Sequence, residues 1–325
     1  MNRATRSLAT ASALATSALV VGIASAEPVA EDRLAAALVT LESMAAKSVA
    51  DGAVPGLAIA VVHDDKVASL KGFGLRQTGR PETVGVDTVF QLASFSKPIS
   101  STVVAAMVGK HLIGWDSRIA DLAPDYQLRD AYPSQQVTVR DLFAHRSGLP
   151  GSAGNDLEDI GYDRETIMHR LALVPPSSSF RAGYAYSNAG LTMGALAAAR
   201  ASGLDWETAA EDFVFKPLGM ASTSYRHSDF EGRADAAQLH VRIGDAWTAL
   251  VKRDADAQAP AGGASSSVRD LGQWMRLELG RGIHDGAPLI PAEAIAETHE
   301  PVMARGPDPI RGNPTFYALG WAVEY

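Results

Sequence analysis

Hydrophobic and polar positions first alternate with a period near that of a helix, over residues 31–52 (EDRLAAALVTLESMAAKSVADG). Apolar residues recur at helical spacing and Gly52 ends the stretch, which predicts an amphipathic helix. The period changes in the stretch that follows, 56–76 (GLAIAVVHDDKVASLKGFGLR). An apolar run at 59–62, a polar turn and a second apolar run predict a β-hairpin there.

The middle and the end of the chain have different patterns. Residues 115–175 alternate short helical stretches with turns rich in Pro, Gly and Asp. The stretches 188–203 (NAGLTMGALAAARASG) and 267–280 (SVRDLGQWMRLELG) predict longer helices, and 318–325 (ALGWAVEY) predicts a last strand. Strands at both ends of a mostly helical middle predict a sheet whose halves are separated by a helical subdomain, placed at about 110–235.

Composition narrows the class of protein. The 325 residues are 46% hydrophobic and 20% charged, as in a soluble globular protein able to bury a sizeable core. The net charge of −8 and the absence of a dense basic cluster argue against a nucleic-acid partner. The sequence has no cysteine, which excludes disulfides, a thiol nucleophile and a cysteine-ligated metal, and suits an oxidising compartment.

The N-terminus predicts where the protein is located. Residues 1–26 carry Arg3 and Arg6, then small and apolar residues, and end in Ala-Ser-Ala. This order is typical of a secretory signal peptide that is removed before Glu27. An N-terminal membrane anchor is the alternative, but the apolar stretch is interrupted by Ser and Thr and is short for a span of about 20 residues. We therefore expect a periplasmic or secreted domain over 27–325, with no stable membrane span.

The stretch 91–100 (QLASFSKPIS) contains candidate catalytic residues. Ser94 and Lys97 are three residues apart at a predicted strand-to-helix junction, and Pro98 follows. In one interpretation Ser94 caps the helix, whose first turn tolerates Pro98. In the other, Lys97 reaches the Ser94 hydroxyl, and a desolvated, partly neutral lysine takes its proton and activates a serine nucleophile. This stretch alone leaves both interpretations open.

A second candidate lies in 183–191 (GYAYSNAGL). A tyrosine beside a lysine can relay protons, so Tyr186 is a candidate partner of Lys97. Asn188 can orient this pair or donate to a substrate carbonyl. In the alternative interpretation, Tyr186 packs against its neighbours and Asn188 caps the helix that follows.

Together these residues resemble a known family. Ser94-Phe95-Ser96-Lys97 followed by Tyr186-Ser187-Asn188 is similar to the motifs of the serine β-lactamase and penicillin-binding-protein superfamily. The chain looks most like the branch of class C β-lactamases, D-Ala-D-Ala carboxypeptidases and esterases, from about residue 35 to the end. The likeness includes, in order, the segments VRDLFAHRSGLPG, FVFKPLGMASTS and AGGASSSVRDLGQWM.

The resemblance implies a fold and a mechanism. The fold is α/β (α+β), an antiparallel sheet flanked by helices with a mostly helical inserted subdomain. Ser94 forms an acyl-enzyme with an ester, a D-amino-acid peptide or a β-lactam, and Lys97 activates it. Tyr186 moves protons with Lys97, and Asn188 holds the substrate. The expected partner is therefore a small molecule or a peptidoglycan-like substrate. The alternatives are a penicillin-type sensor that is acylated without turnover and a catalytically impaired fragment.

One motif of the family is missing from the sequence. The family carries a Lys-Thr-Gly or His-x-Gly triplet on the strand after one like LGWAVEY, but this chain ends at Tyr325. Neither HDG at 284–286 nor RGN at 311–313 has the right context. The resemblance therefore implies that the C-terminal strands and one oxyanion-hole donor are missing, with the Ser94 backbone N–H as the other donor.

Other candidate chemistry is weaker. His145 and Ser147 suggest a Ser/His pair, but Gly148 and Pro150 indicate a turn. No serine lies in the Gly-x-Ser-x-Gly pattern. The remaining histidines lack HExxH spacing and no phosphate-binding Gly-rich loop is present, so we expect neither a metal nor a cofactor.

Overall fold

The computed structural model describes residues 29–324, so the signal peptide predicted over 1–26 lies outside the described residues. The chain forms two compact units. Residues 1–40 form the first unit, whose described part includes the first half of helix α1 (Glu31–Ala50). Residues 41–325 form the second unit, which holds the remaining elements.

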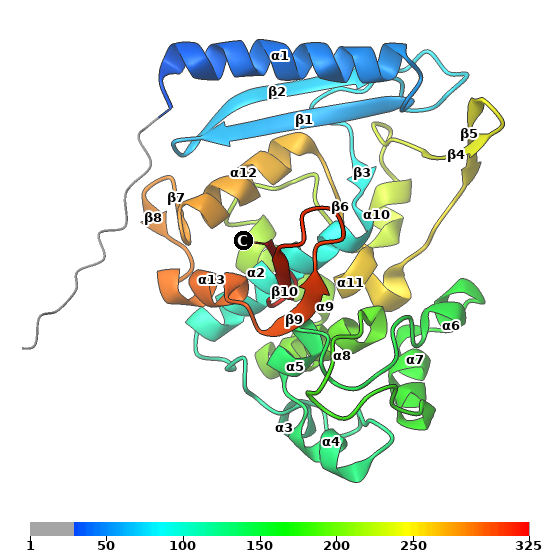
Figure 1. Ribbon diagram of the computed structural model, residues 1–325, viewed down its shortest axis with the longest axis vertical. Helices are drawn as coiled ribbons and strands as arrows, with labels where there is room; N and C mark the ends of the chain where they lie inside the picture. The colour runs from blue at the N-terminus through cyan, green and yellow to red at the C-terminus, as the bar shows by residue number, and fades with distance from the viewer. Residues whose placement is uncertain (1–28, 325) are drawn as a thin grey trace, which may run out of the picture. The chain divides into compact units, whose positions relative to one another are not determined.

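The predicted hairpin consists of β1 (Gly56–His63) and β2 (Lys66–Gly74). Its turn is formed by Asp64 and Asp65, with φ angles of 48° and 54°. Positive φ at both positions characterises the two-residue turn that matches the twist of paired strands, and Asp tolerates it better than most residues. Helix α12 (Val268–Leu279) packs against both strands, as Figure 1 shows.

The other strands form small antiparallel sheets, so the architecture is the expected mixture of helices and antiparallel strands. In the described residues the strands do not join into one sheet, and most of them pair only through a local hairpin. The pairs are β3 (Phe90–Gln91) with β6 (Ser265–Ser266), β4 (Leu239–Ile243) with β5 (Ala246–Val251), and β7 (Ile283–His284) with β8 (Ala287–Pro288). A three-stranded sheet has the order β11 (Ala322–Glu324), β10 (Pro314–Tyr317), β9 (Met303–Pro307).

Two buried helices form the centre of the second unit. Helix α2 (Ser96–Gly109) and helix α8 (Asn188–Ser202) contact each other, and nearly all their residues are buried. Helices that are buried on most sides pack closely against their neighbours. Small side chains allow this close packing, and α8 is rich in them. Helix α11 (Ala259–Gly262) contacts both of them. The site described below lies where these three helices meet.

Between residues 110 and 235 the described regular elements are all helical. The separate subdomain predicted there stays a prediction.

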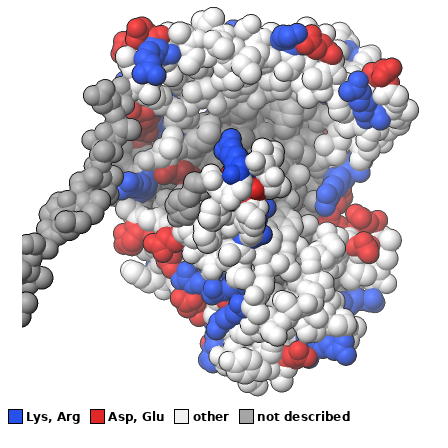
Figure 2. Space-filling model, viewed as in Figure 1, with Lys and Arg blue, Asp and Glu red and all other residues white. Residues whose placement is uncertain are grey.

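Basic and acidic side chains are interspersed on the face shown in Figure 2. No helix among the described residues is both long and apolar enough to cross a membrane. The remaining helices are α3 (Ile119–Leu122), α4 (Ala131–Gln136), α5 (Val139–Phe143), α6 (Asn155–Asp159), α7 (Arg164–Arg170), α9 (Trp206–Ala210), α10 (His227–Glu231) and α13 (Ala292–His299), with 3-10 turns η1 (Ala93–Phe95), η2 (Leu171–Leu173) and η4 (Asp256–Gln258) and the π-helical turn η3 (Glu211–Phe215).

The last predicted strand is only partly correct. Residues 318–321 form a turn, and the strand β11 begins at Ala322. Gly320 has φ of 86°, and a Cβ atom there would lie 2.8 Å from the carbonyl oxygen of Lys97. Only glycine fits such a close approach in the left-handed region. The turn thereby brings the C-terminal segment against helix α2.

Candidate active site

A sharp change of direction presents Ser94. Strand β3 is followed by Leu92, whose N–H donates to the carbonyl of Ala264 at 2.8 Å. Ala93 then has φ of 48°, which is uncommon for a residue with a Cβ. Ser94 lies in the 3-10 turn η1, one turn before α2, and not within the α-helix that the sequence pattern predicts. The side chain is exposed, so a reacting molecule can reach it.

Lys97 lies directly behind this serine and is almost inaccessible. Its side chain is 1% exposed. The Nζ atom donates to Ser94 Oγ at 3.1 Å, to Asn188 Oδ1 at 2.7 Å and to the carbonyl of Ala261 at 2.8 Å. No carboxylate is among these partners, so no opposite charge offsets the loss of water around a charged amine.

Burial lowers the pKa of Lys97 from its usual 10.5 to about 7, and the positive charge of Arg253 adds to this. The amine is therefore far more often neutral at neutral pH than that of an exposed lysine. A neutral amine in hydrogen-bond contact with a serine hydroxyl can accept its proton. The lowered pKa agrees with the sequence-based requirement that this lysine be partly neutral.

Tyr186 covers the other side of the lysine. The Lys97 Nζ atom lies 4.4 Å from the centroid of the Tyr186 ring. Burial raises the pKa of Tyr186, against the opposing effects of a hydrogen bond to Ser94 and the positive charge of Arg305. Tyr186 is therefore a neutral phenol at neutral pH, which both donates and accepts hydrogen bonds. Its ring lies beside the Lys97 amine and its side chain is hydrogen-bonded with Ser94, so it lies next to both groups.

Asn188 connects the lysine to helix α8. Its Oδ1 accepts from Lys97, and its Nδ2 donates to Asn155 Oδ1 at 3.3 Å. The interpretation of Asn188 as a helix cap is wrong. Ser187 is the N-cap, because its Oγ accepts from the backbone N–H of Gly190 at 3.0 Å. The side chain of Asn188 is thus available for the site.

Two partners of the site were not predicted. Asn155 orients the amide of Asn188, and Ala261 offers its backbone carbonyl to Lys97. Both lie far from Lys97 in the sequence. Every residue has a backbone carbonyl, so the residue type at 261 does not show that its carbonyl accepts a hydrogen bond. The only available signal was that Ala261 begins the quoted segment AGGASSSVRDLGQWM.

Ser147 and His145 do not pair with each other. Ser147 Oγ accepts from the Leu149 N–H at 3.4 Å, while His145 Nδ1 accepts from the Ser187 N–H at 3.1 Å. One exposed group has the residue types of a metal site, and Arg200 donates to both of its carboxylates. Its members are Asp125, Glu165 and His169.

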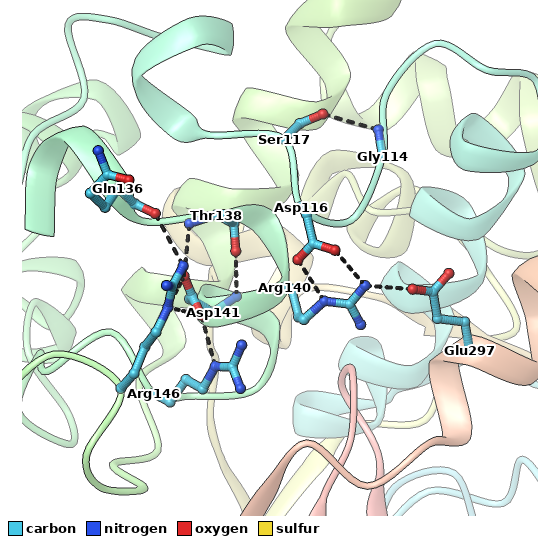
Figure 3. A network of polar contacts seen from close by, with 10 residues as sticks. Gly114, Asp116, Ser117, Gln136, Thr138, Arg140, Asp141, Arg146 and Glu297 are labelled. Carbon is cyan, nitrogen blue, oxygen red and sulfur yellow. Dashed lines mark hydrogen bonds and ion pairs between the residues drawn. The ribbon is translucent and has the colours of Figure 1, made fainter.

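The segment before Tyr186 is fastened by a buried carboxylate, shown in Figure 3. Asp141 is 0% exposed. It accepts from the Thr138 N–H at 3.1 Å, from Arg146 Nε at 2.7 Å and from Arg181 Nη2 at 2.8 Å. Burial alone would raise the pKa of Asp141, but the hydrogen bonds from Arg181 and Arg146 lower it. The charged network therefore ties helix α5 to the segment that leads to Tyr186.

The mixed helix-and-sheet fold is that of the β-lactamase and penicillin-binding-protein superfamily. A family model described as Beta-lactamase matches residues 41–325, and the chain belongs to this family. It is similar to "Unguisins hydrolase ungD'" of Aspergillus campestris (strain IBT 28561), with 24% identity over 83% of this chain and 52% of that protein. It is 32% identical to "Esterase EstB" of Burkholderia gladioli over 48% of this chain and 42% of that protein.

A solved structure supports the same fold. The class C beta lactamase from Rhodobacter sphaeroides is 26% identical and superimposes with a TM-score of 0.67, covering 87% of this chain and 74% of that chain. The chain spans about half the length of the first two curated relatives that it matches, 52% and 50%.

Proposed function

We propose that this chain is a serine hydrolase in which Ser94 forms an acyl-enzyme with an ester, a D-amino-acid peptide or a β-lactam. The observation that carries the proposal is the pairing of an exposed Ser94 hydroxyl with the Nζ atom of Lys97 at 3.1 Å, in a position where the amine is 1% exposed. The family membership and the names of the esterase and hydrolase relatives support the same reaction class.

The proposed acylation begins with a proton transfer. Neutral Lys97 accepts the proton of the Ser94 hydroxyl as Oγ forms a bond to the carbonyl carbon of the substrate. The negative charge that develops on the carbonyl oxygen faces the N-terminal end of helix α2, where the backbone N–H of Ser94 is the expected donor. When the tetrahedral species collapses, the bond to the leaving group breaks, and Tyr186 passes it a proton that Lys97 replaces.

Deacylation reverses the roles. A water molecule gives its proton through Tyr186 and Lys97 while its oxygen attacks the acyl carbon, and Ser94 recovers its proton as the acid leaves. Asn188 supports both steps, because its hydrogen bond holds Lys97 toward Ser94. We further propose that the protein works in the periplasm or outside the cell, as the pattern of residues 1–26 suggests.

The test is covalent labelling of the nucleophile. A fluorophosphonate should add one label, which peptide mapping should locate at Ser94 and which Ser94→Ala should abolish. Lys97→Arg should be labelled very slowly, because a guanidinium does not give up its proton. Lys110→Arg is the matched control, since Lys110 is exposed just after the end of the same helix. Labelling that persists in Ser94→Ala or maps to Ser147 would overturn the proposal.

Substrate class is tested on the same protein. Nitrophenyl esters, a D-Ala-D-Ala peptide and a chromogenic cephalosporin distinguish esterase, peptidase and β-lactamase activity. A burst of one acyl group per Ser94 without further turnover would identify a penicillin-type sensor.

A further inference from the structure

His145 is a buried histidine that the proposed mechanism does not use. It follows helix α5, has φ of 55° and is 2% exposed. Its ring lies against Tyr186, with 4.6 Å between the ring centroids. Rings of Tyr317 and Tyr184 lie on other sides, at 4.8 Å and 5.9 Å. A histidine that only formed the turn would not need to be enclosed by three aromatic rings.

Two hydrogen bonds join His145 to the residues on either side of Tyr186. The backbone N–H of Ala185 donates to the His145 carbonyl at 2.9 Å. The backbone N–H of Ser187 donates to the His145 ring at Nδ1, at 3.1 Å. Main chain and side chain of one residue thus hold both neighbours of Tyr186, and the His145 ring contacts the tyrosine ring between them at an interplanar angle of 43°.

The ring has the protonation state that this arrangement requires. Because Nδ1 accepts a hydrogen bond, the proton of the neutral ring is on Nε2. Burial, with the positive charges of Lys97 and Arg305, lowers the pKa of His145 to about 3. The ring therefore stays neutral across the range in which Lys97 titrates, and Nδ1 remains an acceptor. In the described part of the chain Nε2 is buried without a hydrogen-bond partner, so the ring makes its polar contact only through Nδ1.

The buried Asp141 network fixes His145 itself. Arg146 follows His145, and its side chain donates to Asp141. The backbone carbonyl of Arg146 accepts from the Arg181 N–H at 2.9 Å. Arg181 also donates to Asp141 (Figure 3 shows this network around Asp141). His145 therefore lies between an anchored carboxylate and the tyrosine, and it has little freedom to move independently of either.

We propose that His145 is a positioning residue for Tyr186, which holds the phenol at the proton-transfer position beside Lys97 and Ser94 through the hydrogen bond from the Ser187 N–H to Nδ1 and through the tilted contact between the two rings. This inference rests on the proposed function. The proposal has a specific consequence. A misplaced Tyr186 slows proton transfer to the leaving group more than it slows attack by Ser94. Small errors of position in such a site have large effects, on the order of 10- to 100-fold in rate.

Two substitutions separate this role from the turn itself. His145→Asn keeps an acceptor near the position of Nδ1, and His145→Gly removes it, while both Asn and Gly tolerate positive φ. Acylation of Ser94 is measured by intact mass with two esters of the same acid, a 4-nitrophenyl ester and an ethyl ester. The ratio kcat/KM for each ester, which includes no step after acylation, is measured on the same variants, so the comparison does not depend on how fast the acyl group is hydrolysed. Thermal unfolding of each variant reports its stability.

The expected result depends on the leaving group. His145→Gly should slow acylation by the ethyl ester about tenfold or more, and acylation by the nitrophenyl ester much less, because nitrophenolate leaves without a proton. His145→Asn should recover most of the ethyl-ester rate. In a double variant with Tyr186→Phe, His145→Gly should change the ethyl-ester rate by less than about threefold. The tyrosine hydroxyl that His145 positions is already absent from that protein.

Three results would overturn the inference. The first is an equal loss with both esters, the second is equal behaviour of His145→Asn and His145→Gly, and the third is a double variant in which the two losses multiply. A folded Gly variant with the wild-type rate on the ethyl ester would also refute it. Failure of the proposed function is distinguishable, because the wild-type protein would then not be acylated at Ser94 by either ester or by a fluorophosphonate.

Discussion

Replacing Lys97 by methionine substitutes an apolar side chain of similar length for the buried amine. Burial lowers the pKa of Lys97 from its usual 10.5 to about 7 in the folded protein. A base whose pKa is lowered by folding binds more protons in the unfolded state between these two values, so its contribution to stability rises with pH across this window. The whole pKa shift corresponds to a destabilisation of the folded state by roughly 5 kcal/mol at low pH. Roughly 2 kcal/mol of this destabilisation disappears between pH 7 and pH 9.

Urea unfolding of the wild type and of Lys97→Met at pH 7 and at pH 9 measures this contribution. The free energy of unfolding of the wild type, minus that of the variant, should increase by roughly 2 kcal/mol from pH 7 to pH 9. Other titrating groups are common to both proteins and cancel in the difference. The hydrogen bonds that the variant loses to Ser94, Asn188 and Ala261 change the difference at both pH values, but contribute little to its change with pH.

Lys216→Met is the matched control. Lys216 is exposed, and its hydrogen bond to Asp212 raises its pKa. Its contribution is therefore present throughout pH 7 to 9 and is lost only at higher pH, so the corresponding difference should stay flat. If the difference for Lys97→Met is also constant within about 0.5 kcal/mol, Lys97 is charged and solvated in the folded protein. That result would refute its role as the base.

The remaining predictions concern two buried carboxylates and the tyrosine. Burial raises the pKa of Glu278 to about 7, so the wild type loses stability as this carboxyl ionises. In urea unfolding, Glu278→Gln should therefore gain roughly 2 kcal/mol of stability relative to the wild type as pH rises from 5 to 8, and a constant difference would contradict the burial argument. Asp141→Asn should destabilise the fold by about 3 kcal/mol, because it removes the buried acceptor of hydrogen bonds from the half-buried Arg146 and the exposed Arg181, and a variant as stable as the wild type would show that the network contributes nothing. Tyr186→Phe should lose less hydrolytic activity than Ser94→Ala in an ester assay, since Lys97 and water remain as proton carriers, and the reverse order would exclude the relay.

Local pattern was enough to predict most of the regular elements. The apolar period of 31–52 and of 188–203, with a glycine at the end of each, indicated α1 and α8, and the two apolar runs around Asp64 and Asp65 indicated the β1–β2 hairpin. These features depend on hydrogen bonds and side-chain contacts between near neighbours, which residue type controls directly. Where a contact with a distant segment decides the backbone, the same method was wrong. Gly320 turns the last predicted strand because it lies against the backbone of Lys97.

The residue types, together with the resemblance of the motifs to a known family, were enough to name Ser94, Lys97, Tyr186 and Asn188 as candidates. Whether these residues meet depends on the tertiary structure. Lys97 is 91 residues from Asn188 and 164 residues from Ala261 along the chain, and it contacts both. The lowered pKa of Lys97 also belongs to the tertiary structure, because it comes from the helices that exclude water around the amine and not from its neighbours in sequence. A spacing of three residues brings a lysine near a serine, but it is packing that lowers the pKa of that lysine.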